Sequence, residues 1–431
     1  MTVLDTTPAP EPAPLRRNRD FRLLWTGAAV SFLSSRVTAV AYPLLVLWHT
    51  DSPLAASVVS FAALLPLLLV QLPAGALVDR WDRRRLMICC EAGRFLALAT
   101  VAAALVAGTV SVPHLAAVAF TEATLTVFYR LAERGAVRNV VEPGHLPAAL
   151  AANEARSRAA GLVGQPGGTL LHSLTRSAPF LFAAAGSLVS LGTLLLIRRP
   201  FQSERSTAPG RLGADVADGI RWLWRQRFLR AALGIVAGSN VLFQVIGLAL
   251  ILMFKEEGRS PATLSVVFAL GGVGGLCGSL WGGRLSRRLR QRTVLVAGTT
   301  AWAALMAGMA LVRDPFALGA LFAGTGFVGA AFNVTAGVYQ VRTTPDEMQG
   351  RVGSTANLIG SGTNALGALG GGLLLTVWGT TRSVLLAAGL MAVLAALAAV
   401  SPALRTEERL IAARAPAGPD STPEETRCPD P

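Results

Sequence analysis

Charged residues are scarce in this sequence. Asp, Glu, Lys and Arg together make up 15% of the 431 residues, whereas hydrophobic residues make up 52%, and the mean hydropathy is +0.51. A soluble globular chain carries about 25% charged residues, so this composition excludes an ordinary soluble domain. The apolar residues gather in runs of about twenty, long enough for a helix to cross the roughly 30 Å hydrocarbon core of a bilayer. The sequence therefore predicts an all-α polytopic membrane protein, because a helix in lipid satisfies its own backbone hydrogen bonds.

The residues and motifs of catalysis are also few. Cys89, Cys90, Cys277 and Cys428 have neither metal-site nor disulfide spacing, and the four histidines are scattered. The sequence has no Walker-type phosphate loop, no HExxH motif and no Ser-His-Asp set. The glycine-rich stretch GGVGGLCG at Gly271 lies inside an apolar run, which favours a helix-packing face over a nucleotide site. We therefore expect neither an enzyme nor a bound metal or cofactor.

Lysine is nearly absent. Lys255 is the only one, all other basic residues are arginine, and the formal net charge is +14. The arginines concentrate in alternate short gaps between the apolar runs, so membrane topology explains the charge better than nucleic-acid binding does. The positive-inside rule then places the arginine-rich gaps and both termini in the cytoplasm. This alternation predicts twelve membrane spans, at residues 22–48, 54–78, 86–108, 114–134, 148–173, 178–198, 228–254, 261–283, 293–312, 315–338, 351–376 and 383–401.

Two pairs of similar segments show an internal repeat. GALVDRWDRRR begins at Gly75 and GSLWGGRLSRR at Gly278, while GLVGQPGGTLL begins at Gly161 and ALGALGGGLLL at Ala365. The nearly equal offsets predict two pseudo-symmetric six-helix bundles, as in one class of transporters. The chain then divides into a disordered cytoplasmic leader (1–17), an N-terminal bundle (18–198), a cytoplasmic linker (199–227), a C-terminal bundle (228–401) and a disordered cytoplasmic tail (402–431). The linker segment ADVADGIRWLWRQRF suits either an interfacial helix or a flexible loop.

The stretch GALVDRWDRRR, from Gly75 to Arg85, resembles the signature of the major facilitator superfamily between helices two and three. That pattern is G-x-L-a-D-r-x-G-r-r, and this chain has Asp82 where a glycine often stands. The resemblance implies the major facilitator fold. It also implies a charge cluster around Asp79 that latches the cytoplasmic gate when the protein faces outward.

A longer part of the chain, from about Asn18 to about Pro402, resembles the twelve-helix branch that includes macrolide-efflux and enterobactin-export proteins. The similarity is carried by NRDFRLLWTGAAVSFL at Asn18, by LPAALAANE at Leu146 and by the acid-x-x-Arg pair at Glu91. Together with the signature, these segments imply a cytoplasmic gate made by Gly75, Asp79, Arg80, Arg83, Arg84, Glu91, Arg94 and Glu154.

The chain departs from this branch at two places that concern coupling. Exporters of the branch often carry Gly-Asp in the middle of helix one, where this chain has Ser-Ser-Arg36, so a cation replaces the usual acid. The antiporter element G-P-x-x-G-G of helix five appears with altered spacing, with its small or bending residues at Gly164, Pro166, Gly167 and Gly168. These residues still predict a bend and a close helix approach.

Ionisable residues inside a span are costly, at about 2.5–3.5 kcal/mol for an arginine on insertion scales, and are therefore paired or hydrated. The deepest candidates for the coupling site and the cavity wall are Arg36 in the first span and Glu122 and Arg130 in the fourth. Arg36 and Glu122 fall at similar depth, so we expect them to pair, with Glu122 taking over the coupling role. A static salt bridge that holds the two spans together is the alternative.

The C-terminal half has no acid that we place deep in its spans. Its polar residues are amides with aromatic neighbours, which suit the binding of a medium-sized amphipathic molecule and, equally, hydrogen bonds between helices. These candidates are Asn240, Phe243, Gln244, Asn333, Tyr339, Gln340, Asn357 and Asn364.

Together these patterns predict a secondary active transporter in a bacterial plasma membrane. The cargo that we expect is a drug, a natural product or a siderophore. We expect export by alternating access, with protons as the coupling ion by analogy with the family, and a monomer in the lipid bilayer. Two other functions stay open: a nutrient importer of the same fold, and a transport-inactive sensor or accessory protein. The replaced acid of the first span is the feature that favours the last of these.

Overall fold

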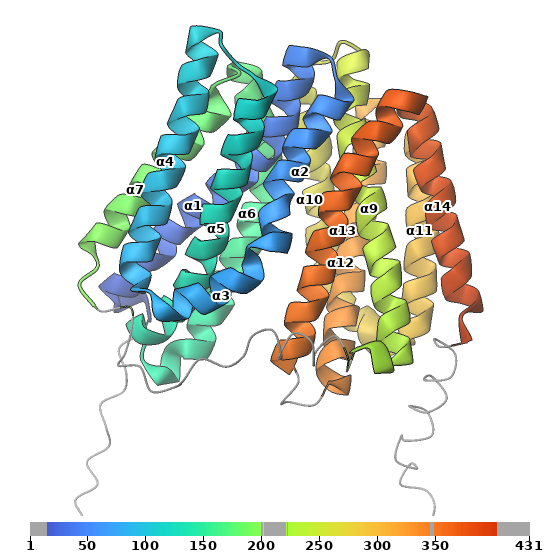
Figure 1. The fold of residues 1–431 in the computed structure, drawn as a ribbon. Coiled ribbons are helices and arrows are strands. Elements are labelled where there is room, and N and C mark those ends of the chain that lie inside the picture. Colours follow the sequence, from blue (N-terminus) through green and yellow to red (C-terminus); the bar gives the residue numbers. More distant parts are fainter. Residues whose placement is uncertain (1–14, 200, 202–220, 222, 345–348, 403–431) are drawn as a thin grey trace, which may run out of the picture.

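The protein is a bundle of long helices (Figure 1). The computed structural model describes residues 15–199, 201, 221, 223–344 and 349–402, and within these residues it contains no β-strand. The helices are α1 (Arg19–Thr50), α2 (Pro53–Leu69), α3 (Gln71–Arg80), α4 (Arg83–Ala107), α5 (Val112–Val140), α6 (Leu146–Leu174), α7 (Ala178–Leu196), α9 (Arg227–Glu256), α10 (Pro261–Arg288), α11 (Gln291–Leu311), α12 (Pro315–Thr343), α13 (Gln349–Trp378) and α14 (Thr380–Val400). The all-α membrane fold class is confirmed.

The helices are consistent with the predicted twelve spans, although not all of them are apolar enough to be identified as spans by composition. Within the described residues, ten helices are long and apolar enough to cross a membrane, and α2 with α3 forms an eleventh candidate that is bent by 57°. The fifth predicted span corresponds to α6, a 29-residue helix that carries Glu154, Arg156 and Arg158. Most of the predicted interfacial segment of the linker lies outside the described residues.

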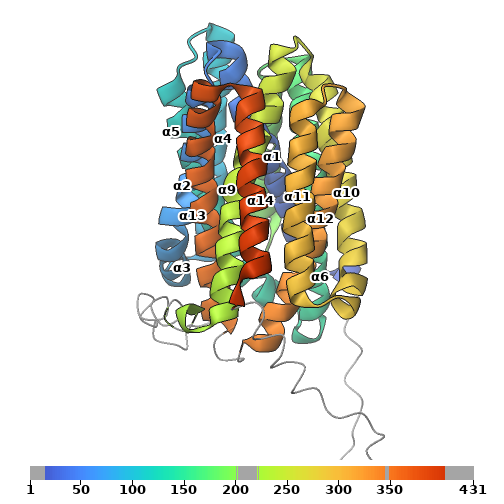
Figure 2. The same cartoon turned by 90° about the vertical axis from the view of Figure 1, so that its right-hand side faces the viewer.

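Two groups of helices make up the bundle. Figure 1 shows α1 to α7 on one side and α9 to α14 on the other, and Figure 2 shows the second group from its own side. The groups meet mainly where α2 packs against α13 and where α6 packs against α10. In the sequence repeat, the region of α2 and α3 matches α10, and α6 matches α13. Each interface is therefore the pseudo-symmetric counterpart of the other.

The glycine-rich stretch at Gly271 is a helix-packing face, as predicted. Gly274 and Gly278 of α10 lie so close to α12 that a Cβ atom on either would meet the backbone of Ala323 or Phe327. Small residues let the two backbones approach to this distance. The stretch therefore holds α10 against α12 in the C-terminal half.

The two halves are joined at the end of the bundle where α1 ends, which we call the Asp51 end. The ammonium group of Lys255, near the end of α9, bonds the carboxylate of Asp51 and the carbonyl oxygen of Leu47. It also lies 6.0 Å from the centroid of the Trp48 ring. At the opposite end, which contains α3 and which we call the Asp79 end, the ribbons of the two halves diverge (Figure 1). The only lysine of the chain thus links the halves at the Asp51 end.

Candidate transport site

A central cavity lies between the two halves. It has a volume of about 460 Å³ and is lined by α1, α2 and α5 on one wall and chiefly by α9 on the other. A second cavity of about 340 Å³ extends it between α6, α10 and α12. The two adjoin each other, since both are lined by Gln165, Phe243, Phe268 and Phe322. Volumes of this size suit a small organic molecule.

Half of the amide and aromatic candidates of the C-terminal half reach this space. Asn240, Phe243, Gln244 and Asn333 line one or both cavities. The others lie elsewhere in the described structure. Tyr339 is buried against Phe228, with ring centroids 4.4 Å apart, and Asn357 and Asn364 lie on α13 outside the two linings. The side chain of Gln340 is outside the described part of the structure.

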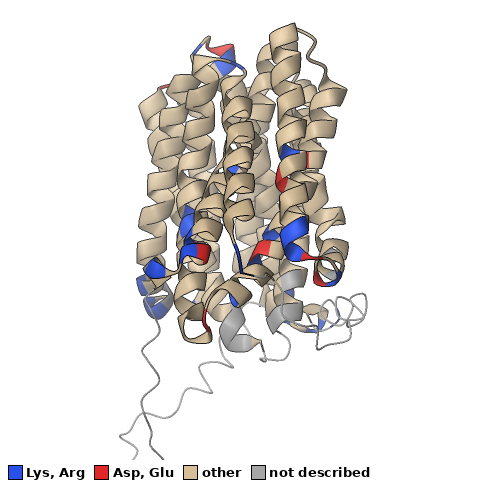
Figure 3. Ribbon diagram, turned by 90° about the vertical axis from the view of Figure 1, so that its left-hand side faces the viewer, with Lys and Arg blue, Asp and Glu red and all other residues tan. Residues whose placement is uncertain are grey.

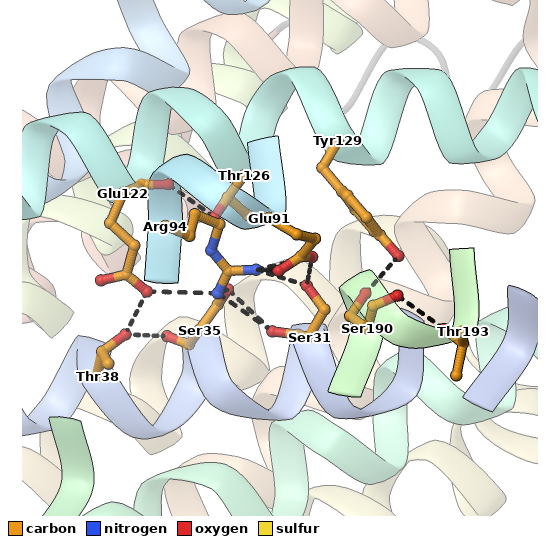
Figure 4. A network of polar contacts seen from close by, with 10 residues as sticks. All are labelled: Ser31, Ser35, Thr38, Glu91, Arg94, Glu122, Thr126, Tyr129, Ser190 and Thr193. Atoms are coloured by element: carbon orange, nitrogen blue, oxygen red, sulfur yellow. Dashed lines mark hydrogen bonds and ion pairs between the residues drawn. The ribbon is translucent and has the colours of Figure 1, made fainter. Parts of the chain in front are cut away.

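A buried polar network lies beside the central cavity in the N-terminal half (Figure 4). Its centre is Arg94 of α4, whose side chain is fully buried. Nη1 of Arg94 lies 3.3 Å from Oε1 of Glu91, one turn earlier on the same helix. Nη2 lies 3.5 Å from Oε1 of Glu122, on α5. One guanidinium group therefore bridges two carboxylates on neighbouring helices.

Serine hydroxyls of α1 complete the bonding of this guanidinium. Ser31 Oγ accepts a hydrogen bond from Arg94 Nη1 at 2.5 Å and donates one to Glu91 Oε1 at 2.5 Å. Ser35 Oγ accepts from Arg94 Nη2 at 2.9 Å. Buried charges are stable only when they are paired and hydrogen-bonded. Helix α1 thus provides the polar surroundings that allow Arg94 and Glu91 to be buried.

The carboxyl group of Glu122 has two further partners on α1. Thr38 Oγ1 lies 2.9 Å from its Oε1, and the Tyr42 hydroxyl lies 2.8 Å from its Oε2. Thr38 Oγ1 also lies 3.2 Å from the backbone carbonyl oxygen of Ser35. Because a hydroxyl has one proton, Thr38 donates to only one of these oxygens at a time. It can donate to ionised Glu122, or donate to Ser35 and accept from protonated Glu122.

The charges of this network do not balance when both acids are ionised. Arg94 contributes one positive charge, whereas Glu91 and Glu122 contribute two negative charges. An unbalanced charge away from water is expensive, and one proton on either acid removes it. Glu122 lines the central cavity, whereas Glu91 has no exposed surface. Glu122 is therefore the acid that is placed to exchange a proton with water in the cavity.

Arg36 does not pair with Glu122 in this structure, contrary to the expectation. Gly164 of α6 packs directly against the Cβ and the backbone of Arg36, so this side of α1 faces α6, whereas Thr38 and Tyr42 face Glu122 on α5. The guanidinium carbon of Arg36 lies 5.0 Å from the centroid of the Phe32 ring instead. The two residues share a depth, but the rotation of α1 separates them.

Arg130 lies over the same aromatic ring. Its guanidinium carbon is 5.2 Å from the centroid of Phe32, and Phe32, Arg36 and Arg130 all line the central cavity. Phe32 and Arg130 also line a third cavity of about 360 Å³ between α1, α5 and α6. That cavity continues toward the Asp79 end, where Arg156 of α6 pairs with Glu133 of α5 at 2.9 Å.

The signature stretch lies at the Asp79 end, where most of the charged residues of the N-terminal half gather (Figure 3). Asp79 is 72% exposed, and its Oδ1 lies 3.4 Å from Nη2 of Arg83. Arg84 donates to the carbonyl oxygens of Leu194 and Leu195 at the end of α7. These bonds all lie within the N-terminal half.

The remaining predicted gate residues lie at different places. Gly75 and Arg80 belong to α3, and a Cβ on Gly75 would meet no atom within 4 Å. Glu154 forms an exposed i,i+4 pair with Arg158 at 2.9 Å and lines the third cavity. Glu91 and Arg94 belong to the buried network and not to the surface around Asp79.

The predicted helix-five element is one side of a helix contact. Helix α6 runs through Pro166 without a break from Leu146 to Leu174. Gly168 packs against Val37 and Val40 of α1, whereas a Cβ on Gly167 would meet nothing within 4 Å. The glycines thus allow the close approach that was predicted between α6 and its neighbour.

Sequence reasoning missed several members of the site. Ser31, Ser35, Thr38 and Tyr42 were not among the candidates, although their spacing of four, three and four residues marks one face of a helix. A polar stripe of this kind in an otherwise apolar span is the signal that could have found them. Glu133, the partner of Arg156, has no such signal, because it lies near the end of its span among other charges.

Comparisons with known proteins agree with this architecture. A model of the family described as transmembrane secretion effector matches residues 9–422. The multidrug efflux pump Tap of Mycolicibacterium fortuitum is 27% identical over 360 residues, which cover 81% of this chain and 86% of the relative. YfiS of Bacillus subtilis (strain 168), an uncharacterized MFS-type transporter, is 26% identical over 340 residues, 75% of this chain and 78% of the relative. The solved structure of the nucleoside transporter NupG covers 88% of this chain and 99% of its own, with a TM-score of 0.76 and 11% identity, which shows the shared fold.

Proposed function

Because the chain belongs to the transmembrane secretion effector family, within the major facilitator superfamily, we propose that it exports a small organic molecule in exchange for protons. The observation that carries the proposal is the buried trio of Glu91, Arg94 and Glu122 beside a central cavity. The cavity provides a substrate site between two halves, and the trio provides a group that gains and loses a proton. The similarity to the efflux pump Tap supports the direction of transport.

We propose that the Asp79 end faces the cytoplasm. The arginine-rich gaps of the sequence lie at this end, and positively charged gaps stay on the cytoplasmic side of bacterial membranes. Both termini then lie in the cytoplasm, and the Asp51 end faces outward. The conformation described above is accordingly inward-facing, because Lys255 and Asp51 join the halves on the outer side.

In the proposed cycle, Glu122 takes up a proton while the cavity is open to the outside and releases it when the cavity is open to the cytoplasm. The release restores the negative charge opposite Arg94 and the hydrogen bonds from Thr38 and Tyr42. These partners lie on α1, the helix whose Leu47 carbonyl oxygen is bonded by Lys255 at the Asp51 end. A change in the charge of Glu122 is therefore transmitted along α1, and substrate and proton move in opposite directions through one alternating site.

The proposal is tested by accumulation of a panel of dyes and antibiotics of both charge signs in cells with and without the protein. We expect lower accumulation of at least one compound in cells with the protein, and a loss of this difference after an uncoupler is added. A difference that is insensitive to the uncoupler would contradict proton coupling. Equal accumulation of every compound would favour the transport-inactive alternative.

A further inference from the structure

We propose that the Arg36–Phe32–Arg130 cluster is a binding subsite for the anionic group of the exported molecule, so that the cargo is an organic anion with an aromatic or apolar body. This inference rests on the proposed export function and names its substrate class. The anionic group is a carboxylate, sulfonate or phosphate, each of which offers oxygens to a guanidinium group.

The cluster contains two positively charged groups. Two guanidinium groups lie 5.0 and 5.2 Å from the centroid of one ring, in a cavity between two membrane-embedded halves. Within the described part of the chain, neither Arg36 nor Arg130 has a carboxylate within ion-pair distance. Arg36 is exposed and Arg130 half-buried in this cavity. Two like charges close together in such a place repel each other unless water or an anion lies between them, and a ligand that displaces this water must supply the anion. The cation–π contacts with Phe32 hold the groups in position but do not neutralise them.

The nearby acids already have partners. Glu122, the acid of the central cavity, is bonded to Arg94, Thr38 and Tyr42. In the third cavity, Glu133 pairs with Arg156, and Glu154 pairs with Arg158. None of these acids forms an ion pair with Arg36 or Arg130.

The wall of the cavity opposite the cluster belongs to the C-terminal half. The residues of the C-terminal half that face the cluster across the cavity are amides, rings and aliphatic groups, among them Phe243, Gln244 and Phe268. The described residues of this wall include no carboxylate. Movement of the two halves against each other would thus bring no acid to Arg36 and Arg130, and the anion must arrive with a ligand. The same wall offers an apolar surface for the body of that ligand.

Arginines line the approach to the cluster from the Asp79 end. Arg134 and Arg138 follow Arg130 at successive turns of α5 and line the third cavity, which leads toward the Asp79 end. The lining of this cavity also includes Glu133 and Glu154, but Arg130, Arg134, Arg138 and Arg156 outnumber them. A cleft with an excess of one sign of charge raises the local concentration of ligands of the opposite sign. A row of arginines from this end to Phe32 therefore provides a path for an anion from the proposed cytoplasmic side.

The subsite is tested with 1-naphthoate and its neutral analogue 1-naphthamide, which share one ring system. Binding is measured by isothermal titration calorimetry on the full chain in lipid nanodiscs, with empty nanodiscs as the partition control. We expect 1-naphthoate to bind at least tenfold more tightly than 1-naphthamide. Arg36→Gln and Arg130→Gln should each lower naphthoate affinity about tenfold and leave naphthamide affinity unchanged. The control Arg158→Gln, at an exposed residue that lines none of the three cavities, should change neither.

Two further variants separate charge from folding. Arg36→Lys and Arg130→Lys keep the positive charge and should keep most of the preference for the anion, and thermal unfolding checks that each variant is folded. Equal affinities for the two compounds, absence of saturable naphthoate binding, or a preference that survives in the Arg36→Gln/Arg130→Gln double variant would overturn the inference. The measurement uses no proton gradient, so its failure is distinct from failure of the proposed coupling.

Discussion

Arg94 is the residue on which the buried network depends. Its guanidinium contacts two carboxylates and two serine hydroxyls, with no exposed surface. Removal of one partner from a buried ion pair leaves the other charge uncompensated, which costs about 3–5 kcal/mol. Because two carboxylates lose the same partner here, we expect the cost of Arg94→Gln to lie in the upper part of that range.

We therefore predict that Arg94→Gln lowers the free energy of unfolding by about 3–5 kcal/mol. Thermal unfolding of the purified protein in detergent measures the change. The matched control is Arg158→Gln, whose exposed pair with Glu154 should contribute less than about 1 kcal/mol. The double variant Arg94→Gln/Glu91→Gln should recover part of the loss, and no recovery would argue against the assigned pairing.

The sequence predicted how deep in the membrane the charged residues lie, but not which residues they contact. Arg36, Glu122 and Arg130 all line the central cavity, as predicted. The predicted pairing of Glu122 with Arg36 was wrong. Depth along a helix follows from counting residues, whereas the direction of a side chain depends on how the helix is rotated. That rotation is fixed by packing of α1 against Gly164 and Gly168, which no single span reveals.

Among the helices, α1 and α6 form the contact that sets this rotation. A Cβ on Gly168 would lie 2.7 Å from the carbonyl oxygen of Val37 and 2.5 Å from a methyl group of Val40. Since backbone atoms cannot move away without shifting the helix, the two helices would have to separate. Overpacking of this kind typically costs about 1–3 kcal/mol.

We predict that Gly168→Ala lowers the thermal stability of the protein and its transport rate, because it shifts α1 and the residues that α1 presents to Arg94 and Glu122. Gly167→Ala is the matched control, since its Cβ would meet no atom within 4 Å. Unfolding temperature and dye efflux at matched expression are the measurements. Equal behaviour of the two variants would contradict the assigned contact.

The elements themselves were largely predictable. Long apolar runs give helices in lipid because no other structure satisfies the backbone there, and the repeat indicated which helices are counterparts. The break between α2 and α3 was not predicted. It follows Leu69 and comes before Pro73, and a proline removes a helical hydrogen bond, but the same residue type stays inside a continuous helix at Pro166.

For the molecule as a whole, the link between the halves is concentrated at Lys255. Its ammonium group on α9 bonds Asp51 and Leu47 of the other half. Loss of this bond should favour conformations in which the Asp51 end is open. An arginine in the same place retains the charge and should retain most of the closed state.

We predict that Lys255→Ala lengthens the distance between spin labels at positions 106 and 311, whereas Lys255→Arg changes it little. Val106 and Leu311 are 84% and 76% exposed and lie near the Asp51 end in opposite halves. Double electron–electron resonance on a variant without the native cysteines measures the distance. An unchanged distribution in Lys255→Ala would show that the closed end is held by other contacts.

The orientation of the molecule gives a further prediction. Cysteines introduced at Thr109 and Asp314, at the Asp51 end, should react with an impermeant thiol reagent in intact cells. Cysteines at Asp82 and Arg288, at the Asp79 end, should react only after the membrane is opened. Labelling of the Arg288 site in intact cells would contradict both the orientation and the count of twelve spans.

Transport into inverted membrane vesicles under an imposed pH gradient tests whether Glu122 carries the coupling proton. The substrate is the compound with the largest protein-dependent efflux in the cell assay. The control is Glu142→Gln, at an exposed residue that lines none of the three cavities. We predict that Glu122→Gln abolishes gradient-driven accumulation while gradient-independent exchange of the substrate continues, because a neutral amide cannot exchange a proton with the cavity. Full gradient-driven accumulation by Glu122→Gln would contradict the account.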